Sequence, residues 1–191
     1  MFDADGTVSP VTVIAIKASK VTQVKTKEKD GYSAVQVGYG DRKEKNISKA
    51  VLGHTKNIGN FELLREFRVE DALPEVGSDV ALDAFKEGDI VAVSGITKAK
   101  GFQGVVKRHG FKGGPRSHGQ KHSEREPGSI GGAGRDGGRV AKGKRMAGRT
   151  GGDRVTVKNL KVVGIDAENR QIFIKGALPG RKGTILEIIS K

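Results

Sequence analysis

Two glycine-rich motifs in the second half of the chain have spacings that could bind a nucleotide. Gly132, Gly134 and Gly137 match the G-x-G-x-x-G pattern of dinucleotide sites, and residues 114–121 resemble a phosphate-binding P-loop. The first motif needs a hydrophobic strand before it and a helix after it, and the surrounding sequence predicts neither. The second has Gln120 in the place of the P-loop lysine. We therefore expect neither motif to bind a nucleotide, and we predict no cofactor.

Two histidines have a spacing that could bind a metal ion. His118 and His122 stand four residues apart, which would place both imidazoles on one face of a helix. Their flanks are rich in glycine, which disfavours a helix, and the sequence offers no third ligand. The interpretation that we favour is that the imidazoles stack on bases or contact phosphate groups. We predict no metal site.

Two acidic residues in the same region, Glu124 and Glu126, could serve as a general acid and a general base. No nucleophile and no set of apolar residues that could form a pocket accompany them. We therefore predict no catalytic residue, no enzymatic activity and no small-molecule substrate. The two carboxylates stand among Arg116, Lys121 and Arg125. We expect them to form ion pairs with these side chains and so to fix the arginine conformations.

All of these residues lie in one basic stretch, residues 98–152. It holds fourteen of the thirty-five Lys and Arg residues but three of the twenty-two acids, so it carries about +11 of the formal net charge of +13. It also holds sixteen of the twenty-nine glycines. Lys and Arg gain free energy by displacing the counterions condensed on phosphates, and glycine lets the backbone approach a crowded surface. The predicted nucleic-acid-binding residues are Lys98, Lys100, Lys107, Arg108, His109, Lys112, Arg116, His118, Lys121, His122, Arg125, Arg135, Arg139, Lys142, Lys144, Arg145 and Arg149.

A disordered solubility tail would carry a similar charge. Two features argue against a tail: the stretch has predicted strands on both sides, and it contains Phe102, Phe111, Ile130 and Met146, which suit a segment that stacks on bases or fills grooves. Its glycines and arginines follow an irregular path rather than a recognition helix, which favours RNA over DNA. A histone-like or membrane-surface role would give the same bulk charge. We predict RNA as the partner.

The rest of the composition limits the class of protein. Of the 191 residues, about 135 lie outside the basic stretch, enough for one domain with a core. The chain has no Cys, which excludes disulfides, thiolate metal sites and thiol catalysis and suits a reducing compartment. No apolar run approaches the roughly 20 residues needed to span a bilayer, and the N-terminal residues lack the features of a signal peptide. We expect a cytoplasmic protein with no membrane partner.

Runs of β-branched residues and alternating apolar residues predict a mainly β protein. Residues 11–16 and 21–25 are expected to pair as a hairpin. Residues 61–69 fit either a helix or a strand, and residues 41–60 are expected to form a loop with one helical turn. The remaining predicted strands are residues 32–39, a short one within 72–84, 89–97, 154–166 as one long or twice-used strand, 171–175 and 184–189.

Six to eight strands with tight turns favour a small closed β-barrel, because closure removes the exposed edges of an open sheet. The basic stretch is then an insertion between two barrel strands, which suits a functional extension. The predicted organisation is a β-barrel domain of residues 1–97 and 153–191 and a glycine-rich extension of residues 98–152.

Five blocks of sequence, in this order, resemble the L-three family of large-subunit ribosomal proteins in its bacterial or organellar form. They are residues 100–109 (KGFQGVVKRH), 117–119 (SHG), 127–131 (PGSIG), 142–148 (KGKRMAG) and 155–160 (VTVKNL). Residues 11–14, 21–24 and 175–180 are similar to the family as well. The resemblance covers nearly the whole chain, and five ordered blocks are far more specific than any single motif.

The resemblance implies a six-stranded barrel of the type shared with translation factors, on the outer surface of the large subunit. It implies a long extension that enters the rRNA and approaches the peptidyl transferase centre. By position, residues 100–109 would be the root of the extension, 117–131 its descending part, 132–139 its tip and 142–149 its returning part. The implied partners are large-subunit rRNA, bound close to its 3′ end, and neighbouring large-subunit proteins. The implied role is to nucleate subunit assembly, in a cytoplasmic or an organellar ribosome.

The sequence departs from the family pattern in three places. It begins at the family's first turn, without the preceding strand and its Lys-x-Gly-Met-Thr pattern. Ala92 stands where an acidic residue is usual, and Ala99 where glycine is usual. The tip lacks the glutamine that is methylated in some bacterial members, so we predict no such modification. A free RNA chaperone or assembly factor with the same barrel and extension is the alternative function, and it would not remain in mature subunits.

Overall fold

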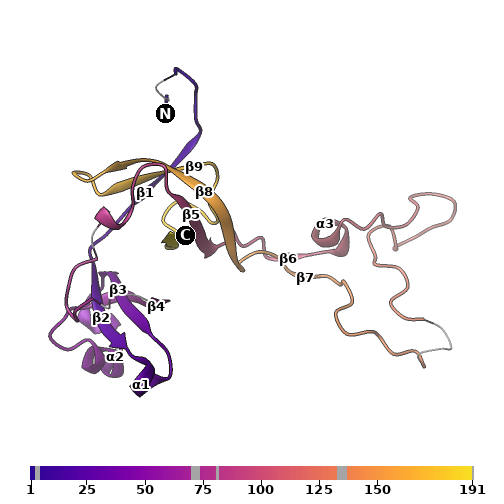
Figure 1. The fold of residues 1–191 in the computed structure, drawn as a ribbon. Coiled ribbons are helices and arrows are strands. Elements are labelled where there is room, and N and C mark those ends of the chain that lie inside the picture. Colours follow the sequence, from indigo (N-terminus) through magenta and orange to yellow (C-terminus); the bar gives the residue numbers. More distant parts are fainter. Residues whose placement is uncertain (3–4, 70–73, 81, 133–136, 191) are drawn as a thin grey trace. The chain divides into compact units, whose positions relative to one another are not determined.

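The computed structural model describes residues 1–2, 5–69, 74–80, 82–132 and 137–190. Its regular elements are mainly strands, which confirms the predicted β class. Contacts between residues divide the chain into two compact units. The first has residues 1–90, 161–176 and 190, and the second has residues 91–160 and 177–189. Figure 1 labels the strands β1 to β9 and the helices α1 to α3.

A three-stranded antiparallel sheet in the order β2-β3-β4 belongs to the first unit. Its strands are β2 (Ser19–Lys25), β3 (Ala34–Asp41) and β4 (Phe61–Arg68). The short helix α1, Lys27–Asp30, joins β2 to β3 at one end of the sheet (Figure 1). The predicted strand at residues 32–39 is therefore confirmed with slightly different bounds. Residues 61–69, which fit either a helix or a strand, form a strand.

Two short helices connect β3 to β4. They are the 3₁₀ helix η1 (Glu44–Asn46) and the α-helix α2 (Lys49–His54). Ser48 caps α2, because its hydroxyl accepts a hydrogen bond from the N–H of Val51. At the other end the hydroxyl of Thr55, which is 2% exposed, donates to the Val51 carbonyl at 3.1 Å. These two side chains stabilise more helix than the single turn predicted from the sequence.

The strand β1, Val11–Ala15, pairs with β9, Gln171–Lys175, in antiparallel register. The predicted hairpin between residues 11–16 and 21–25 is therefore wrong, although both segments are strands. β9 also pairs with the end of β8 (Arg154–Asp166), from Val162 opposite Ile174 to Asp166 opposite Gln171. Val162, Ile172 and Ile174 are fully buried. The pairing with β9 places Thr12 and Ile14 of β1 opposite the buried Ile174 and Ile172, so the hydrophobic effect favours this long-range pairing.

The second unit contains parts of three strands. They are most of β5 (Ile90–Ile96), the first part of β8 (Arg154–Asp166) and most of β10 (Leu186–Ser190). These strands belong to a five-stranded sheet of order β1-β9-β8-β5-β10. Hydrogen bonds from Thr97 N–H to the Asp153 carbonyl and from Val162 N–H to the Asp89 carbonyl lie at the two ends of the β5–β8 pairing. Because β8 pairs with both β5 and β9, the prediction of one long, twice-used strand is confirmed.

A closed six-stranded barrel is not found in the described residues, whose strands form sheets of five, three and two strands. The outer edge of β2 is covered in another way. Val21 N–H donates to the Ser78 carbonyl at 2.9 Å, and Val80 N–H donates to the Ser19 carbonyl at 2.9 Å. Among the described residues of 72–84, the predicted short strand is an isolated bridge between Lys20 and Asp79, followed by the 3₁₀ helix η2, Leu82–Ala84. These bonds satisfy backbone groups of Ser19 and Val21, so the first part of the β2 edge has partners without a barrel strand beside it.

Candidate nucleic-acid interface

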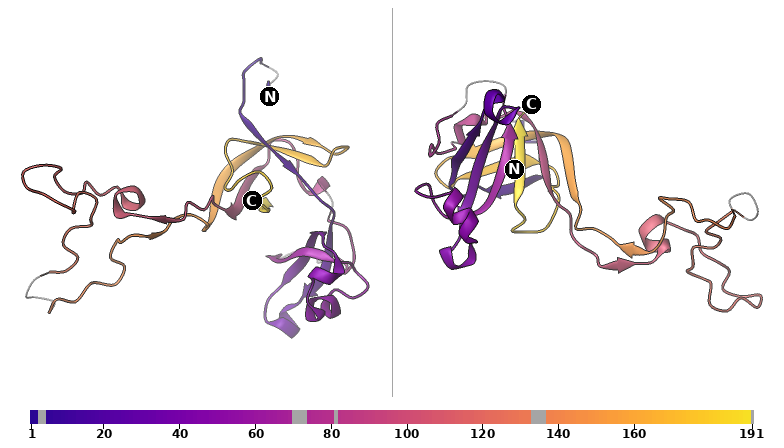
Figure 2. Two further views of the ribbon diagram at one scale, coloured as in Figure 1. Left: turned by 180° about the vertical axis from the view of Figure 1, so that it is seen from behind. Right: turned by 90° about the horizontal axis from the view of Figure 1, so that it is seen from below.

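Residues 98–152, called the arm from here on, leave the end of β5 and return to the start of β8 through a two-stranded stem. The stem contains β6 (Phe102–Gln103) and β7 (Gly148–Arg149), which pair in antiparallel fashion. Hydrogen bonds from Lys100 N–H to the Thr150 carbonyl, 2.8 Å, and from Thr150 N–H to the Gly101 carbonyl, 2.9 Å, continue the pairing toward β5 and β8. Figure 2 shows the two sides of the arm diverging beyond this stem.

One glycine of the stem has no room for a side chain. Gly151 has a φ of 74°, and a Cβ built on it would lie 2.1 Å from the Lys98 carbonyl oxygen. The left-handed backbone and the close approach both require glycine at this position. At the root of the arm, glycine therefore has a structural role. This role is separate from the close approach to a polyanion that the composition predicts.

The helix α3, Val105–His109, follows β6 and carries three of the predicted RNA-binding residues. Two of these contact the returning side of the arm. Arg108 donates from a guanidinium nitrogen to the Met146 carbonyl at 2.8 Å, and His109 Nε2 lies 3.0 Å from the same oxygen. Val105 is 2% exposed and anchors the helix. Arg108 and His109 therefore hold the arm's root together. Sequence reasoning missed this role, because a backbone carbonyl thirty-seven or more positions away leaves no pattern in the side chains.

A tight loop lies further out, between residues 113 and 124. Gly114 N–H donates to the Glu124 carbonyl at 2.9 Å, and a Cβ on Gly113 would lie 1.9 Å from that carbonyl oxygen. Arg116 Nε lies 2.6 Å from Glu124 Oε1, an ion pair across the same loop. The prediction that Glu124 pairs with a neighbouring arginine is confirmed. For Glu126 the described contact is a backbone one, from its N–H to the Ser123 carbonyl.

The two histidines considered for a metal site lie in this loop region. Residues 117–122 form turns and bends rather than a helix, and both His118 and His122 are exposed. His118 has a φ of 61°, a left-handed conformation that is incompatible with an α-helix at this position. Among the described residues there is no group of three or more His, Cys, Asp and Glu side chains placed to hold a metal ion.

The outermost described residues come from both sides of the arm. A Cβ built on Gly131 would lie 3.7 Å from the Arg139 carbonyl oxygen, so the descending and returning chains approach each other here. Arg135, one of the predicted RNA-binding residues, lies outside the described residues, as does Gly134 of the G-x-G-x-x-G motif.

The arm's cations are exposed and have few partners in the protein. All the predicted RNA-binding side chains that the structure describes are exposed, except that of His109, which is half-buried. Within the described part of the arm, Arg116 is the one cation in an ion pair with another described residue. Apart from the Arg108 and His109 pair at the root, the structure spreads the cations along the arm instead of bringing them together. A spread of uncompensated charge of one sign suits an extended polyanion better than a single anionic group.

Comparisons with known proteins place the sequence among ribosomal proteins. The profile of the family described as ribosomal protein L3 matches residues 66–189. A protein of Syntrophobacter fumaroxidans named large ribosomal subunit protein uL3 is 48% identical, over 98% of this chain and 90% of its own length. Proteins of the same name from a Picosynechococcus species and from Nocardia farcinica are also 48% identical, covering 98% and 100% of this chain and 89% and 87% of their own lengths. None of the helices in the described residues is long and apolar enough to cross a membrane.

Proposed function

Because the chain belongs to the ribosomal protein L3 family, we propose that it is a structural constituent of the large ribosomal subunit whose arm binds large-subunit rRNA. The single observation that carries the RNA-binding proposal is the line of exposed cations along the arm, of which only Arg116 pairs with a described acid. In a ribosome the missing counter-charges are the phosphates of the rRNA, and their displaced counterions supply free energy of binding.

The architecture of the arm fits this task. The hydrogen-bonded stem and the contacts of Arg108 and His109 with the Met146 carbonyl fix the direction in which the arm starts. Beyond them the arm has little regular structure, so its backbone can follow the irregular surface of folded RNA. Contacts of this kind position RNA helices without reading their sequence.

The finer parts of the proposal come from the family resemblance and rest on position in the sequence. Residues 1–97 and 153–191 would form the domain at the subunit surface, among neighbouring large-subunit proteins. The tip, residues 132–139, would approach the peptidyl transferase centre. Binding close to the 3′ end of the rRNA would help to nucleate assembly, and no catalytic step is assigned to the chain. The site of action would be the cytoplasmic ribosome, or an organellar one.

A free RNA chaperone or assembly factor is the alternative, and sedimentation separates it from the proposal. The tagged chain would be recovered from gradients that separate immature from mature large subunits, with ultraviolet crosslinks mapped from Arg139 and Lys144. We expect one copy per mature subunit and crosslinks to rRNA near the peptidyl transferase centre. Recovery on immature particles alone would contradict the proposal and support the assembly factor.

A further inference from the structure

A second basic surface lies in the first unit, on the two short helices between β3 and β4. Residues 42–58 contain five Lys and Arg residues and one acid. The positive charge of the whole chain is confined to the arm and to this segment, because the remaining residues together have sixteen cations and eighteen acids. The cations of the segment are Arg42, Lys43, Lys45, Lys49 and Lys56, and all five are exposed.

Two other cations of the same unit are compensated by acids of β4. Lys17, which precedes β2, pairs with Glu62 at 3.2 Å, and Lys25 of β2 pairs with Glu66 at 2.9 Å. No cation of residues 42–58 forms an ion pair with another described residue. As in the arm, the charge is left without compensation inside the part of the protein that the structure describes, which suits a polyanionic partner.

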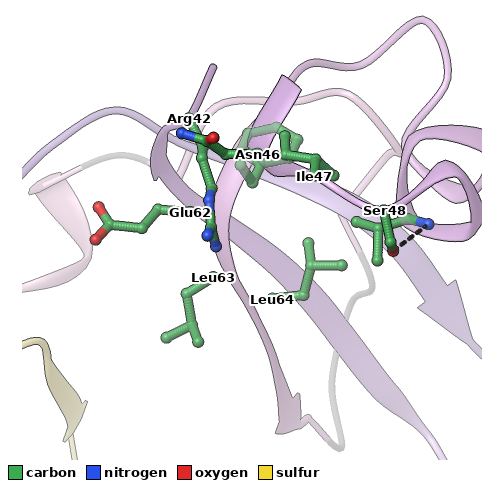
Figure 3. A pocket seen from close by; sticks show the side chains of 9 residues that line it. Arg42, Asn46, Ile47, Ser48, Glu62, Leu63 and Leu64 are labelled. Atoms are coloured by element: carbon green, nitrogen blue, oxygen red, sulfur yellow. Dashed lines mark hydrogen bonds between the residues drawn. The ribbon is translucent and has the colours of Figure 1, made fainter. Parts of the chain in front are cut away.

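The segment also borders a groove of about 300 Å³ beside β4. Its walls include the apolar side chains of Ile47 and Val51 from the segment and of Leu63 and Leu64 from β4. Figure 3 shows Arg42 and Asn46 together toward one end of the groove and Ser48 toward the other. The acid in the lining, Glu62, is paired with Lys17, so Arg42 is left as the groove's uncompensated charge.

This combination fits one chemical class of occupant. A flat nucleobase would bury its faces against the apolar side chains, while the Asn46 amide can donate and accept hydrogen bonds at its edge and the Ser48 hydroxyl, which accepts from the Val51 N–H, can still donate. The Arg42 guanidinium can bind the attached phosphate through two parallel hydrogen bonds. An apolar side chain of a protein partner would give no hydrogen bonds to the Asn46 amide or the Arg42 guanidinium and no counter-charge to the surrounding cations.

We infer that residues 42–58 form a second RNA-binding surface, which holds the RNA backbone on its cations and takes one unpaired nucleotide into the groove beside β4. The inference rests on the proposed function for the identity of the RNA, but it uses different residues from the arm. The surface would give the protein two separate points of attachment to rRNA, and two tethered contacts bind more tightly than either alone.

The test is ultraviolet crosslinking of the full chain to deproteinised bacterial large-subunit rRNA, with the crosslinked peptides identified by mass spectrometry. Crosslinks are expected from residues 42–64 as well as from the arm. In the double variant Lys45→Glu/Lys49→Glu, the yield from residues 42–64 should fall about tenfold while the arm crosslinks remain. A matched control is Lys27→Glu/Lys29→Glu, which makes the same charge change on α1, another exposed helix of the same unit, and should change neither yield.

A second variant tests the groove without changing any charge. Asn46→Ala removes the amide that would bind the edge of the base and should lower the crosslinks from residues 42–64 severalfold. Circular dichroism melting checks that each variant is folded.

Arm crosslinks without any from residues 42–64, or crosslinks from 42–64 that survive both variants, would overturn the inference. So would crosslinks from this segment to another protein alone in assembled subunits. Absence of all crosslinks, the arm's included, would instead overturn the proposed function.

Discussion

In the β2-β3-β4 sheet a cluster of charged side chains is paired within the protein, whereas most cations in the described part of the arm have no ion-pair partner there. Lys25 donates to the Tyr32 hydroxyl at 2.8 Å and lies 2.9 Å from Glu66, whose carboxylate also accepts from Tyr32. The hydrogen bonds to Tyr32 and Glu66 raise the pKa of Lys25, and the hydrogen bond from Lys25 lowers the pKa of Glu66. The arm's cations have one such pairing, that of Arg116 with Glu124, among the described residues.

The difference separates two uses of charge in one chain. Charges that are compensated within the fold contribute to its stability, if only slightly at an exposed surface. Charges that the fold leaves uncompensated repel one another, and a partner of opposite sign relieves that repulsion. A run of such charges with a large excess of one sign therefore indicates a surface that binds a partner, and it does so without reference to any relative.

A substitution at the root of the arm should give the larger effect on stability. Gly151→Ala places a methyl group against the Lys98 carbonyl and a left-handed φ on a residue with a Cβ, so we expect a loss of about 2 kcal/mol in the free energy of unfolding. The measurement is urea denaturation followed by circular dichroism. Gly101→Ala is the matched control, because Gly101 has a φ of 67° in the same stem but no atom within 4 Å of its Cβ position. Equal losses in the two variants would contradict the steric part of this account.

A substitution in the sheet should give a smaller effect that depends on pH. Glu66→Gln removes the carboxylate that Lys25 contacts, so the variant should be less stable than the wild type at neutral pH. Because the pKa of Glu66 is lowered in the folded state, its contribution is present above the usual carboxyl pKa and is lost as the pH falls through the lowered value. Thermal melts from pH ~7 to ~3 should therefore show the two proteins converging in acid, with rRNA affinity unchanged at neutral pH. A stability difference that stays constant over this range would show that the carboxylate's charge is not its cause.

The sequence was sufficient for most of the local structure. Alternating and β-branched residues predicted most of the strands. The basic stretch lies between β5 and β8 together with β6, α3 and β7, and its role as an RNA-binding extension stays a prediction. The neighbourhood of Arg116 and Glu124 predicted their ion pair, because the two residues are eight positions apart in a short segment that turns at His118 and Gly119. In each case the interacting groups are close in the sequence or share a strong periodicity.

What failed was pairing over long distances. Residues 11–16 and 21–25 look like a hairpin because only the short segment 17–20 separates them, but β1 pairs with β9, more than 150 residues later. A closed barrel was predicted because exposed sheet edges are costly. Instead, residues 77–80 form backbone hydrogen bonds with Ser19 and Val21 at the edge of β2. The contacts of Arg108 and His109 with the Met146 carbonyl were not predicted, because both side chains are basic and were interpreted as RNA contacts.

The central claim is that the arm's uncompensated cations bind rRNA, and the salt dependence of binding tests it most directly. The wild type would be compared with Arg139→Gln/Lys142→Gln/Lys144→Gln/Arg145→Gln, using filter binding to deproteinised bacterial large-subunit rRNA over a range of salt concentrations. The control neutralises four exposed lysines outside both basic regions, Lys27, Lys29, Lys86 and Lys175. We expect the slope of log affinity against log salt to fall by about 3 to 4 in the arm variant and to stay the same in the control. An unchanged slope in the arm variant, or an equal loss in both, would contradict the claim.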